Sequence, residues 1–134
     1  MAKIGIIRCE KNEHKCPLTN CLKSLAEGGQ GFAVHQGPNT LVGVFTCRCP
    51  GDQAVNLGKI LKSKGAEVIH WCTCLFAHKE EGRWLAGDGF CQDVDSLIQR
   101  VAREAEITCV KGTAHLPQGY QPEVSGQDTA MRES

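Results

Sequence analysis

The chain has 134 residues, nine of them cysteine, and its 15 Lys and Arg residues balance its 15 Asp and Glu residues. This length fits one domain with a single core. The zero formal charge gives no excess of basic residues that would favour binding to nucleic acid or to an anionic membrane. A composition that is 41% hydrophobic and 22% charged excludes wholesale disorder, and no apolar run is long enough to span a bilayer.

The N-terminus indicates a cytoplasmic protein with reduced thiols. Its apolar run is about four residues long, shorter than the ~7–15 residues of a signal peptide, and acidic residues follow at once. An odd number of cysteines also argues against a fully paired disulfide framework. In a reducing compartment three roles are open to the nine thiols: metal binding, redox chemistry, or burial as small apolar side chains.

The apolar segments are continuous rather than alternating, which is typical of buried parallel strands. Helical patterns lie between them, and Asp52 is expected to cap the second helix. This alternation favours an α/β three-layer sandwich with a mostly parallel sheet in the flavodoxin-like order 2-1-3-4-5. In chain order, the sequence predicts a strand over 3–9, a helix over 17–27, a short edge strand over 31–35, a strand over 41–47, a helix over 52–65, a strand over 67–74, a helix over 94–105 and a strand over 106–111.

The last part of the chain differs from the rest. From Leu116 onward the sequence has little apolar content and no periodicity, so residues 116–134 are expected to form a flexible tail. No internal repeat is visible beyond the alternation of strands and helices. We therefore expect one α/β domain over residues 1–115.

Most of the cysteines fall where the expected strands end or just beyond. Parallel strands all end at one edge of the sheet, where open α/β sheets bind ligands, and neighbouring strands lie only about 4.8 Å apart. His115 follows the last strand at this edge. Cys109 lies inside that strand and Cys21 inside a helical pattern, so both are expected to be buried as small apolar side chains that fill the core, which we call filler. The candidate metal ligands are Cys9, Cys16, Cys47, Cys49, Cys72, Cys74, Cys91 and His115.

This set of donors predicts a metal-binding protein whose partner is a metal ion. Thiolates are soft ligands that select zinc, Cu(I) or an iron–sulfur cluster, and thiolates with one imidazole suit tetrahedral zinc. The cysteines form no Cys-x-x-Cys pair, so the folded chain would bring the metal ligands together, and the metal would not be what organises the fold. We expect zinc, with an iron–sulfur cluster as the alternative because more than four thiols are available. The sequence assigns no enzymatic activity.

A thiol-redox enzyme is the competing hypothesis. Arg48 stands between Cys47 and Cys49, and a helix begins nearby. Both features lower the pKa of a thiol, so this dithiol could cycle through a disulfide. The absence of a Cys-x-x-Cys motif at a strand-to-helix turn argues against this hypothesis.

Around its central Cys-Arg-Cys-Pro-Gly, residues 47–51, the sequence resembles the CGGC-domain family, small bacterial and archaeal proteins regarded as zinc binders. The likeness extends from the N-terminus to His115 and includes IGIIRC (4–9), Cys16-Pro17, GAEVIHWCTC (65–74), Cys91 and KGTAH (111–115). The resemblance implies a metal site more than an activity, and its matching residues are Cys9, Cys16, Cys49, Cys74, Cys91 and His115. This chain departs from the family in having Cys-Arg-Cys for Cys-Gly-Gly-Cys, an extra Ala114, and Cys72 where a small polar residue is common.

Overall fold

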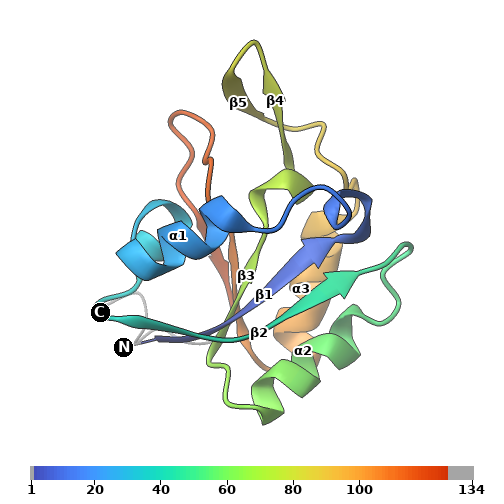
Figure 1. The fold of residues 1–134 in the computed structure, drawn as a ribbon. Helices are drawn as coiled ribbons and strands as arrows, with labels where there is room; N and C mark the ends of the chain where they lie inside the picture. The colour runs from blue at the N-terminus through green and yellow to red at the C-terminus, as the bar shows by residue number, and fades with distance from the viewer. Residues whose placement is uncertain (1, 127–134) are drawn as a thin grey trace.

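The computed structural model describes residues 2–126, which form a five-stranded sheet with helices around it (Figure 1). The strands of this sheet are β1 (Ala2–Cys9), β2 (Asn39–Cys47), β3 (Val68–Trp71), β6 (Thr108–Lys111) and β7 (Glu123–Ser125). The helices are α1 (Thr19–Glu27), α2 (Ala54–Ser63) and α3 (Val94–Glu104). The remaining elements are the short 3-10 turns η1 (Glu10–Asn12), η2 (Gln30–Val34) and η3 (Thr73–Leu75) and a separate hairpin of β4 (Ala77–Glu80) and β5 (Arg83–Ala86).

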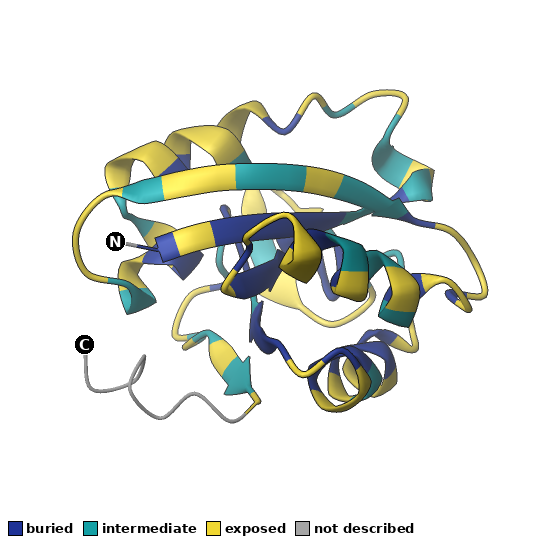
Figure 2. Cartoon of the chain, turned by 90° about the horizontal axis from the view of Figure 1, so that it is seen from below, coloured by how far each residue is buried: buried dark blue, intermediate teal, exposed yellow. Residues whose placement is uncertain are grey.

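The strand order of the sheet is β2-β1-β3-β6-β7, in which the first four strands are parallel and β7 is antiparallel to β6. The prediction of an α/β fold with a mostly parallel sheet is confirmed. The predicted order is wrong in one position: the strand over 41–47 was expected between those over 3–9 and 67–74, but β2 lies at the edge of the sheet and β1 pairs directly with β3. Helix α1 lies on one face of the sheet, and α2 and α3 lie on the other (Figures 1 and 2). The four parallel strands therefore end at the same edge.

The prediction of an edge strand over 31–35 is wrong, because these residues form η2 and do not join the described sheet. The Gly31 N–H donates to the Thr113 carbonyl (N···O 2.8 Å), and the Phe32 N–H closes a turn, so the backbone bends away from an extended conformation. The Phe32 side chain is fully buried, with its ring 4.2 Å from that of His70. The apolar run thus anchors a turn in the core, and β2 takes the place beside β1.

The chain returns to the sheet after β6. Residues 123–125, which belong to the segment expected as a tail, form β7 and pair with β6. The Tyr120 hydroxyl donates to the Lys111 carbonyl (O···O 2.6 Å), and its ring centroid lies 5.3 Å from that of Phe76, so side-chain contacts anchor this return. Residues 1 and 127–134 lie outside the described residues, and the domain boundary expected at residue 115 stays a prediction.

The central strands carry the core. Ile6, Ile69 and Trp71 are fully buried, whereas the edge strand β2 is partly exposed along its length (Figure 2). β3 ends at Trp71, earlier than the predicted strand over 67–74, and η3 follows it directly. Cys72 and Cys74 therefore lie in a tight turn beyond the strand.

The three helices lie close to the predicted ranges. α2 begins after Gln53, and no side-chain hydrogen bond caps it, so the expected capping by Asp52 is wrong. Asp52 precedes the N-cap position by one residue and is exposed. Over residues 2–126, no helix combines the length and the apolar character that crossing a bilayer requires.

A Gly58→Ala substitution tests the packing of α2 against α3. A Cβ at Gly58 would lie 2.8 Å from Val101 Cγ1 and 3.3 Å from the Ala105 Cβ. Overpacking of a filled core costs about 1–3 kcal/mol, which exceeds the roughly 1 kcal/mol that alanine gains over glycine in a helix. We expect the free energy of unfolding, measured with urea, to fall by about 1 kcal/mol.

The exposed neighbour Lys59 provides the control, since Lys59→Ala should change the stability by less than about 0.5 kcal/mol. A G58A variant that is as stable as the parent, or more stable, would contradict the tight packing between these two helices.

Candidate functional site

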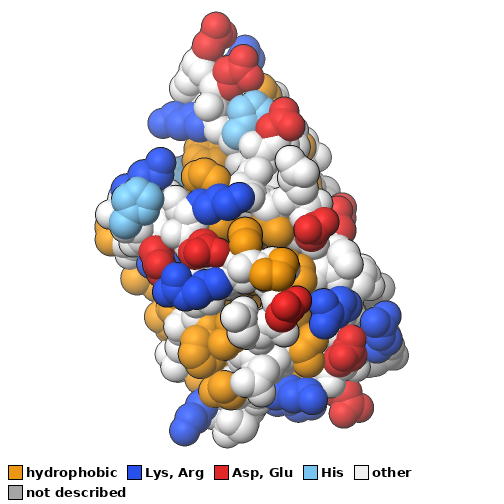
Figure 3. All heavy atoms as spheres, turned by 90° about the vertical axis from the view of Figure 1, so that its right-hand side faces the viewer, with side chains coloured by type: hydrophobic (Ala, Val, Ile, Leu, Met, Phe, Trp, Pro, Cys, Tyr) orange, Lys and Arg blue, Asp and Glu red, His pale blue; other side chains and the backbone are white. Residues whose placement is uncertain are grey.

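Four cysteines line one cleft of about 300 Å³ at the edge where the parallel strands end. Cys9 and Cys47 are the last residues of β1 and β2 and lie opposite each other in the parallel register. Cys49 follows in the next turn, and Cys91 belongs to the loop before α3. Figure 3 faces the side toward which β1 and β2 point, where hydrophobic side chains, a class that includes cysteine in this view, lie between charged ones. The structure thus brings four of the predicted ligands together.

The turn that carries Cys49 is shaped by Gly51. This glycine has φ +92°, a conformation that side chains with a Cβ rarely adopt. A Cβ at this position would lie 2.9 Å from Leu97 Cδ1 and 3.6 Å from Cys47 Sγ, so the backbone passes close to the thiol. The Cys49 N–H donates to the Glu10 carboxylate, which ties the turn to η1. Glycine therefore allows the turn to close over the cleft.

The Arg48 guanidinium pairs with two carboxylates. Its Nη1 lies 3.0 Å from Glu13 Oε1 and 3.9 Å from Glu10 Oε1, and the Arg48 hydrogen bond lowers the pKa of Glu13. The pKa of Cys47 is raised, not lowered. The interpretation that Arg48 activates a Cys47/Cys49 dithiol is therefore wrong for Cys47, because tertiary contacts pair the guanidinium with carboxylates.

Burial and mutual proximity raise the pKa values of three cleft thiols, those of Cys9, Cys47 and Cys91. The pKa of Cys47 is raised to about 11, first by burial and then by the neighbouring thiols of Cys91 and Cys9. Burial is also the main reason why the pKa values of Cys9 and Cys91 are raised. The Lys11 N–H, which donates to Cys9 Sγ at 3.4 Å, only partly offsets this effect. Because clustered thiolates repel one another, a bound cation would favour their ionised form.

A second group of thiols lies where α1 meets the turn after β3. The Cys21 thiol donates to Thr113 Oγ1 (S···O 3.2 Å), and the Thr73 N–H donates to the same oxygen, so Cys21 lies beside the turn that carries Cys72 and Cys74. The pKa of Cys21 is lowered to about 6, mainly by the Cys72 hydrogen bond and with help from Thr113 and the Ala114 N–H. The pKa of Cys72 is raised well above its usual range by the same hydrogen bonds and by burial. These three cysteines form what we call the inner thiol group.

Cys21 was expected to be filler, and the sequence analysis missed the hydrogen bond that its thiol donates to Thr113. Leu18 and Leu25 of the α1 region are 6% exposed, whereas Leu22, also expected to face inward, is 37% exposed. The spacing of three and four residues puts Cys21 on the same helix face as Leu18 and Leu25. A different choice of helix phase would have directed Cys21 toward the sheet.

Four predicted ligands are not among the residues that line the cleft: Cys16, Cys72, Cys74 and His115. Cys16, in the loop before α1, accepts a hydrogen bond from Arg8 through its carbonyl and is not among the residues that line the cleft. The exposed His115 stacks on Trp84 with ring centroids 5.1 Å apart, and its Nε2 lies 3.0 Å from Asn20 Nδ2. Their roles as ligands stay predictions.

Cys109 lies inside β6, as expected for filler. It is fully buried, and burial raises its pKa to about 12. Its Sγ lies 3.7 Å from the Ile107 carbonyl and donates to it. Cys109 is therefore the natural control for experiments on the other thiols.

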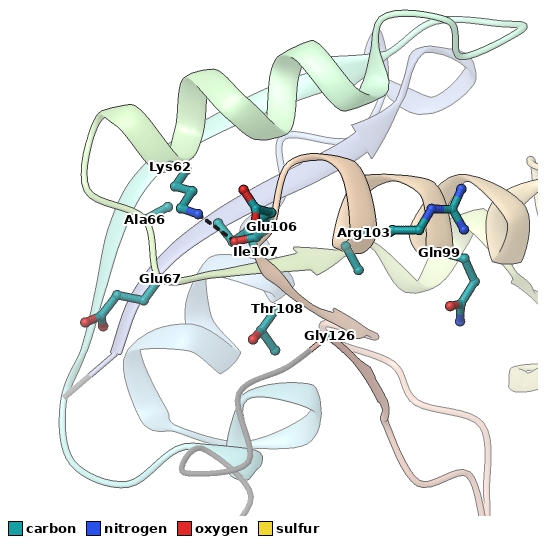
Figure 4. Close-up of a pocket in the computed structure, with 10 residues that line it drawn as sticks. Lys62, Ala66, Glu67, Gln99, Arg103, Glu106, Ile107, Thr108 and Gly126 are labelled. Carbon is teal, nitrogen blue, oxygen red and sulfur yellow. Dashed lines mark hydrogen bonds between the residues drawn. The ribbon is translucent and has the colours of Figure 1, made fainter.

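A wider depression of about 960 Å³ lies at the opposite edge of the sheet and is lined without any cysteine (Figure 4). Its walls come from α2, α3 and the segments before β3 and β6, and it carries charges of both signs. Lys62 Nζ donates to the Glu106 carbonyl across it (N···O 2.7 Å). This depression has no soft donors, so the thiol-lined cleft is the better candidate for metal chemistry.

The cleft brings donors together without a closed coordination sphere. Within residues 2–126, no group of three or more His, Cys, Asp or Glu side chains is arranged so that it could hold a metal ion as it stands. Cys49 is exposed, and Cys91 is half-buried, and both lie in loops. Loops tolerate movement better than strands do, so these two residues are the ones that can adjust.

The contrast between Cys21 and Cys47 predicts unequal alkylation in the reduced, metal-free protein. At pH 7 we expect iodoacetamide to modify Cys21 at least about 100-fold faster than Cys47, because only the thiolate reacts and their pKa values are about 6 and about 11. The Cys21 rate should level off above its pKa, whereas the Cys47 rate should keep rising with pH. Quenched time courses read by peptide mass spectrometry measure both rates.

The same reaction in guanidinium chloride serves as the control, since the two rates should converge once the fold is lost. Equal rates in the folded protein would contradict the different environments of these thiols.

The chain was compared with known proteins once this geometry was established. The sequence pattern of the CGGC domain matches residues 3–114. No curated protein and no solved structure matches the chain. The matched range includes every cysteine of the cleft and of the inner thiol group. The chain therefore belongs to the CGGC domain family.

Proposed function

We propose that this chain binds a thiophilic metal ion, zinc in the first place, through Cys9, Cys47, Cys49 and Cys91. The observation that carries the proposal is that four thiols from separate parts of the chain line one cleft. Random burial of cysteine as filler would scatter these side chains through the core, as it does for Cys109. The membership in the CGGC domain family supports the same site class.

The chemistry of the four donors fits zinc. Four cysteine thiolates complete the tetrahedral coordination that zinc prefers in closed, structural sites. When bound, the ion supplies a positive charge that holds the sulfurs as thiolates and offsets their mutual repulsion. The pKa of Cys47, raised to about 11, is what such a thiol is expected to have while no cation is near it.

A closed site at this place would act on the fold. Cys9 and Cys47 are fixed by β1 and β2, whereas Cys49 and Cys91 belong to loops. An ion held by all four would tie both loops to the strand ends, and the binding free energy would add to the stability of the folded state. We therefore propose a structural metal site and assign no catalytic role to it.

An activated Cys47 thiol, which the dithiol hypothesis requires, is not supported. The hypothesis invoked Arg48 and a nearby helix start to lower the thiol pKa, but Arg48 pairs with Glu13 and Glu10, and the pKa of Cys47 is raised. Cys47 is also 7% exposed, so oxidants reach it poorly. We propose no redox role for this pair.

Metal analysis of protein purified without oxygen tests the proposal. We expect about one zinc ion per chain, and Cys47→Ser or Cys91→Ser should weaken zinc binding at least about tenfold, the loss that removing even a supporting residue causes. Cys109→Ser and Cys16→Ser should keep the zinc. Mass spectrometric metal analysis and competition with a chromophoric chelator give the stoichiometry and the affinity.

The outcomes separate the alternatives. Iron with acid-labile sulfide in place of zinc would overturn the choice of metal while keeping the cysteine set. Protein that takes up no metal, and in which all thiols titrate readily, would overturn the proposal itself. Loss of zinc in C16S but not in C91S would show that the ligands were chosen wrongly.

Zinc binding should also release protons and raise the thermal stability. The metal-free thiols of Cys9, Cys47 and Cys91 carry protons at pH 7.5, since their pKa values are raised. Calorimetric titrations in buffers of different ionisation enthalpy should therefore report roughly one proton released for each coordinating thiol that was protonated. Apparent zinc affinity should fall as the pH is lowered. An affinity that does not change between pH 8 and pH 6 would contradict thiol ligation.

A further inference from the structure

The short turn η1 (Glu10–Asn12) lies beyond the arrowhead of β1 (Figure 1) and begins at one of the four cysteines of the cleft. Cys9 is its N-cap, and the Lys11 N–H donates to Cys9 Sγ (N···S 3.4 Å). The turn is therefore fixed to the end of a buried strand of the sheet. A side chain of η1 that reaches a loop links that loop to the sheet.

The Lys11 side chain makes such a link to the loop that carries Cys91. Its ammonium donates to the Phe90 carbonyl (Nζ···O 3.2 Å), 79 positions away in the sequence. The other side of this loop is attached to the turn after β3, because the N–H groups of Phe90 and Cys91 donate to carbonyls of that turn (both N···O 2.9 Å). Lys11 thus completes a two-sided attachment of the Cys91 loop.

The neighbouring residue Glu10 makes a link to the other loop of the cleft. Its carboxylate accepts the Cys49 N–H. Arg48 in the same loop lies 3.9 Å from Glu10 Oε1 and 3.0 Å from Glu13 Oε1 through its Nη1. Two adjacent side chains of opposite charge therefore hold one loop each, and these are the loops whose thiols no strand fixes.

Lys11 also carries the charge that a site of thiolates needs nearby. Within residues 2–126, it is the one Lys or Arg that lines the cleft, and Asp93 is the one acid. Four thiolates carry more negative charge than a divalent ion neutralises, and Asp93 adds to this excess. The Lys11 ammonium opposes it, and the Lys11 N–H on Cys9 Sγ acts in the same direction, because a hydrogen bond to a thiolate favours its charged form.

We propose that Lys11 and Glu10 are positioning residues of the metal site. Lys11 holds the Cys91 loop against the cleft and offsets the charge of the bound thiolates, and Glu10 holds the backbone of Cys49. The inference rests on the proposed function, and it adds residues that contact the ligands and not the metal. Such outer groups orient the ligands of metal sites and tune their affinity.

Competition for zinc with a chromophoric chelator, on the full chain purified without oxygen, tests Lys11. We expect Lys11→Met to weaken zinc binding about tenfold and to speed zinc release, at the lower end of what loss of a supporting residue causes because Lys11 is exposed. Lys11→Arg keeps the charge and a donor, so it should restore most of the affinity. Lys15 is the matched control, since its Nζ lies 5.8 Å from the Phe90 ring centroid without lining the cleft. Lys15→Met should change the affinity less than about threefold.

A pair of Glu10 variants separates its hydrogen bond from its charge. Glu10→Ala removes the acceptor of the Cys49 N–H, so zinc binding should weaken. Glu10→Gln keeps an acceptor oxygen and removes a negative charge near the thiolates, so it should bind zinc at least as tightly as the parent. Weaker binding in E10Q, equal to that in E10A, would contradict the positioning role of Glu10.

Hydrogen exchange in the metal-free chain gives a readout that does not depend on zinc. The amides of Phe90 and Cys91 should exchange faster in K11M than in the parent, because one side of their loop is released. The amides of α2 should exchange as in the parent, which shows that the fold is intact. Weaker zinc binding in K11M without faster exchange in this loop would contradict the positioning of Cys91 by Lys11.

The outcomes keep the two proposals apart. Parent protein that takes up no zinc would overturn the metal site and this inference with it. Parent protein that binds zinc, together with a K11M variant that binds it as tightly, would overturn this inference alone. Zinc binding in K11R that is as weak as in K11M would contradict the role of the Lys11 charge.

Discussion

The parallel pairing of β1 with β2 is the constraint on which the thiol-rich edge depends. Cys9 and Cys47 end these strands in register, so the sheet itself fixes two sulfurs side by side. A parallel pair requires a crossover connection, and the crossover here contains α1. That helix lies on the face of the sheet opposite α2 and α3 (Figure 1) and carries Cys21, whose thiol donates to Thr113 Oγ1. One topological requirement therefore positions both the strand-end thiols and Cys21.

The two groups differ because their surroundings differ. At the cleft, burial and neighbouring thiols raise the pKa of Cys47, and its charged form needs a cation. In the inner thiol group, hydrogen bonding outweighs burial and lowers the pKa of Cys21 to about 6. The same side chain thus has its pKa shifted in opposite directions at the two places.

Continuous apolar runs predicted the parallel strands and placed Cys9 and Cys47 at their ends, because strand burial leaves a strong local pattern. The run over 31–35 was misleading, since Phe32 is buried from a turn rather than from a strand. Cys21 was missed because its role depends on helix phase. The pairing of Arg48 with Glu13, which is 35 positions away, follows from the fold and leaves no local signature.

Zinc-edge X-ray absorption spectroscopy on the full chain, purified without oxygen, tests the central claim most directly, because it reports which atoms surround the metal. The proposed site predicts about four sulfur ligands at about 2.3 Å. A Cys109→Ser sample should give the same spectrum, and a Cys91→Ser sample should lose a sulfur. A spectrum dominated by nitrogen and oxygen ligands in the parent protein would contradict a metal held by the four cysteines of the cleft.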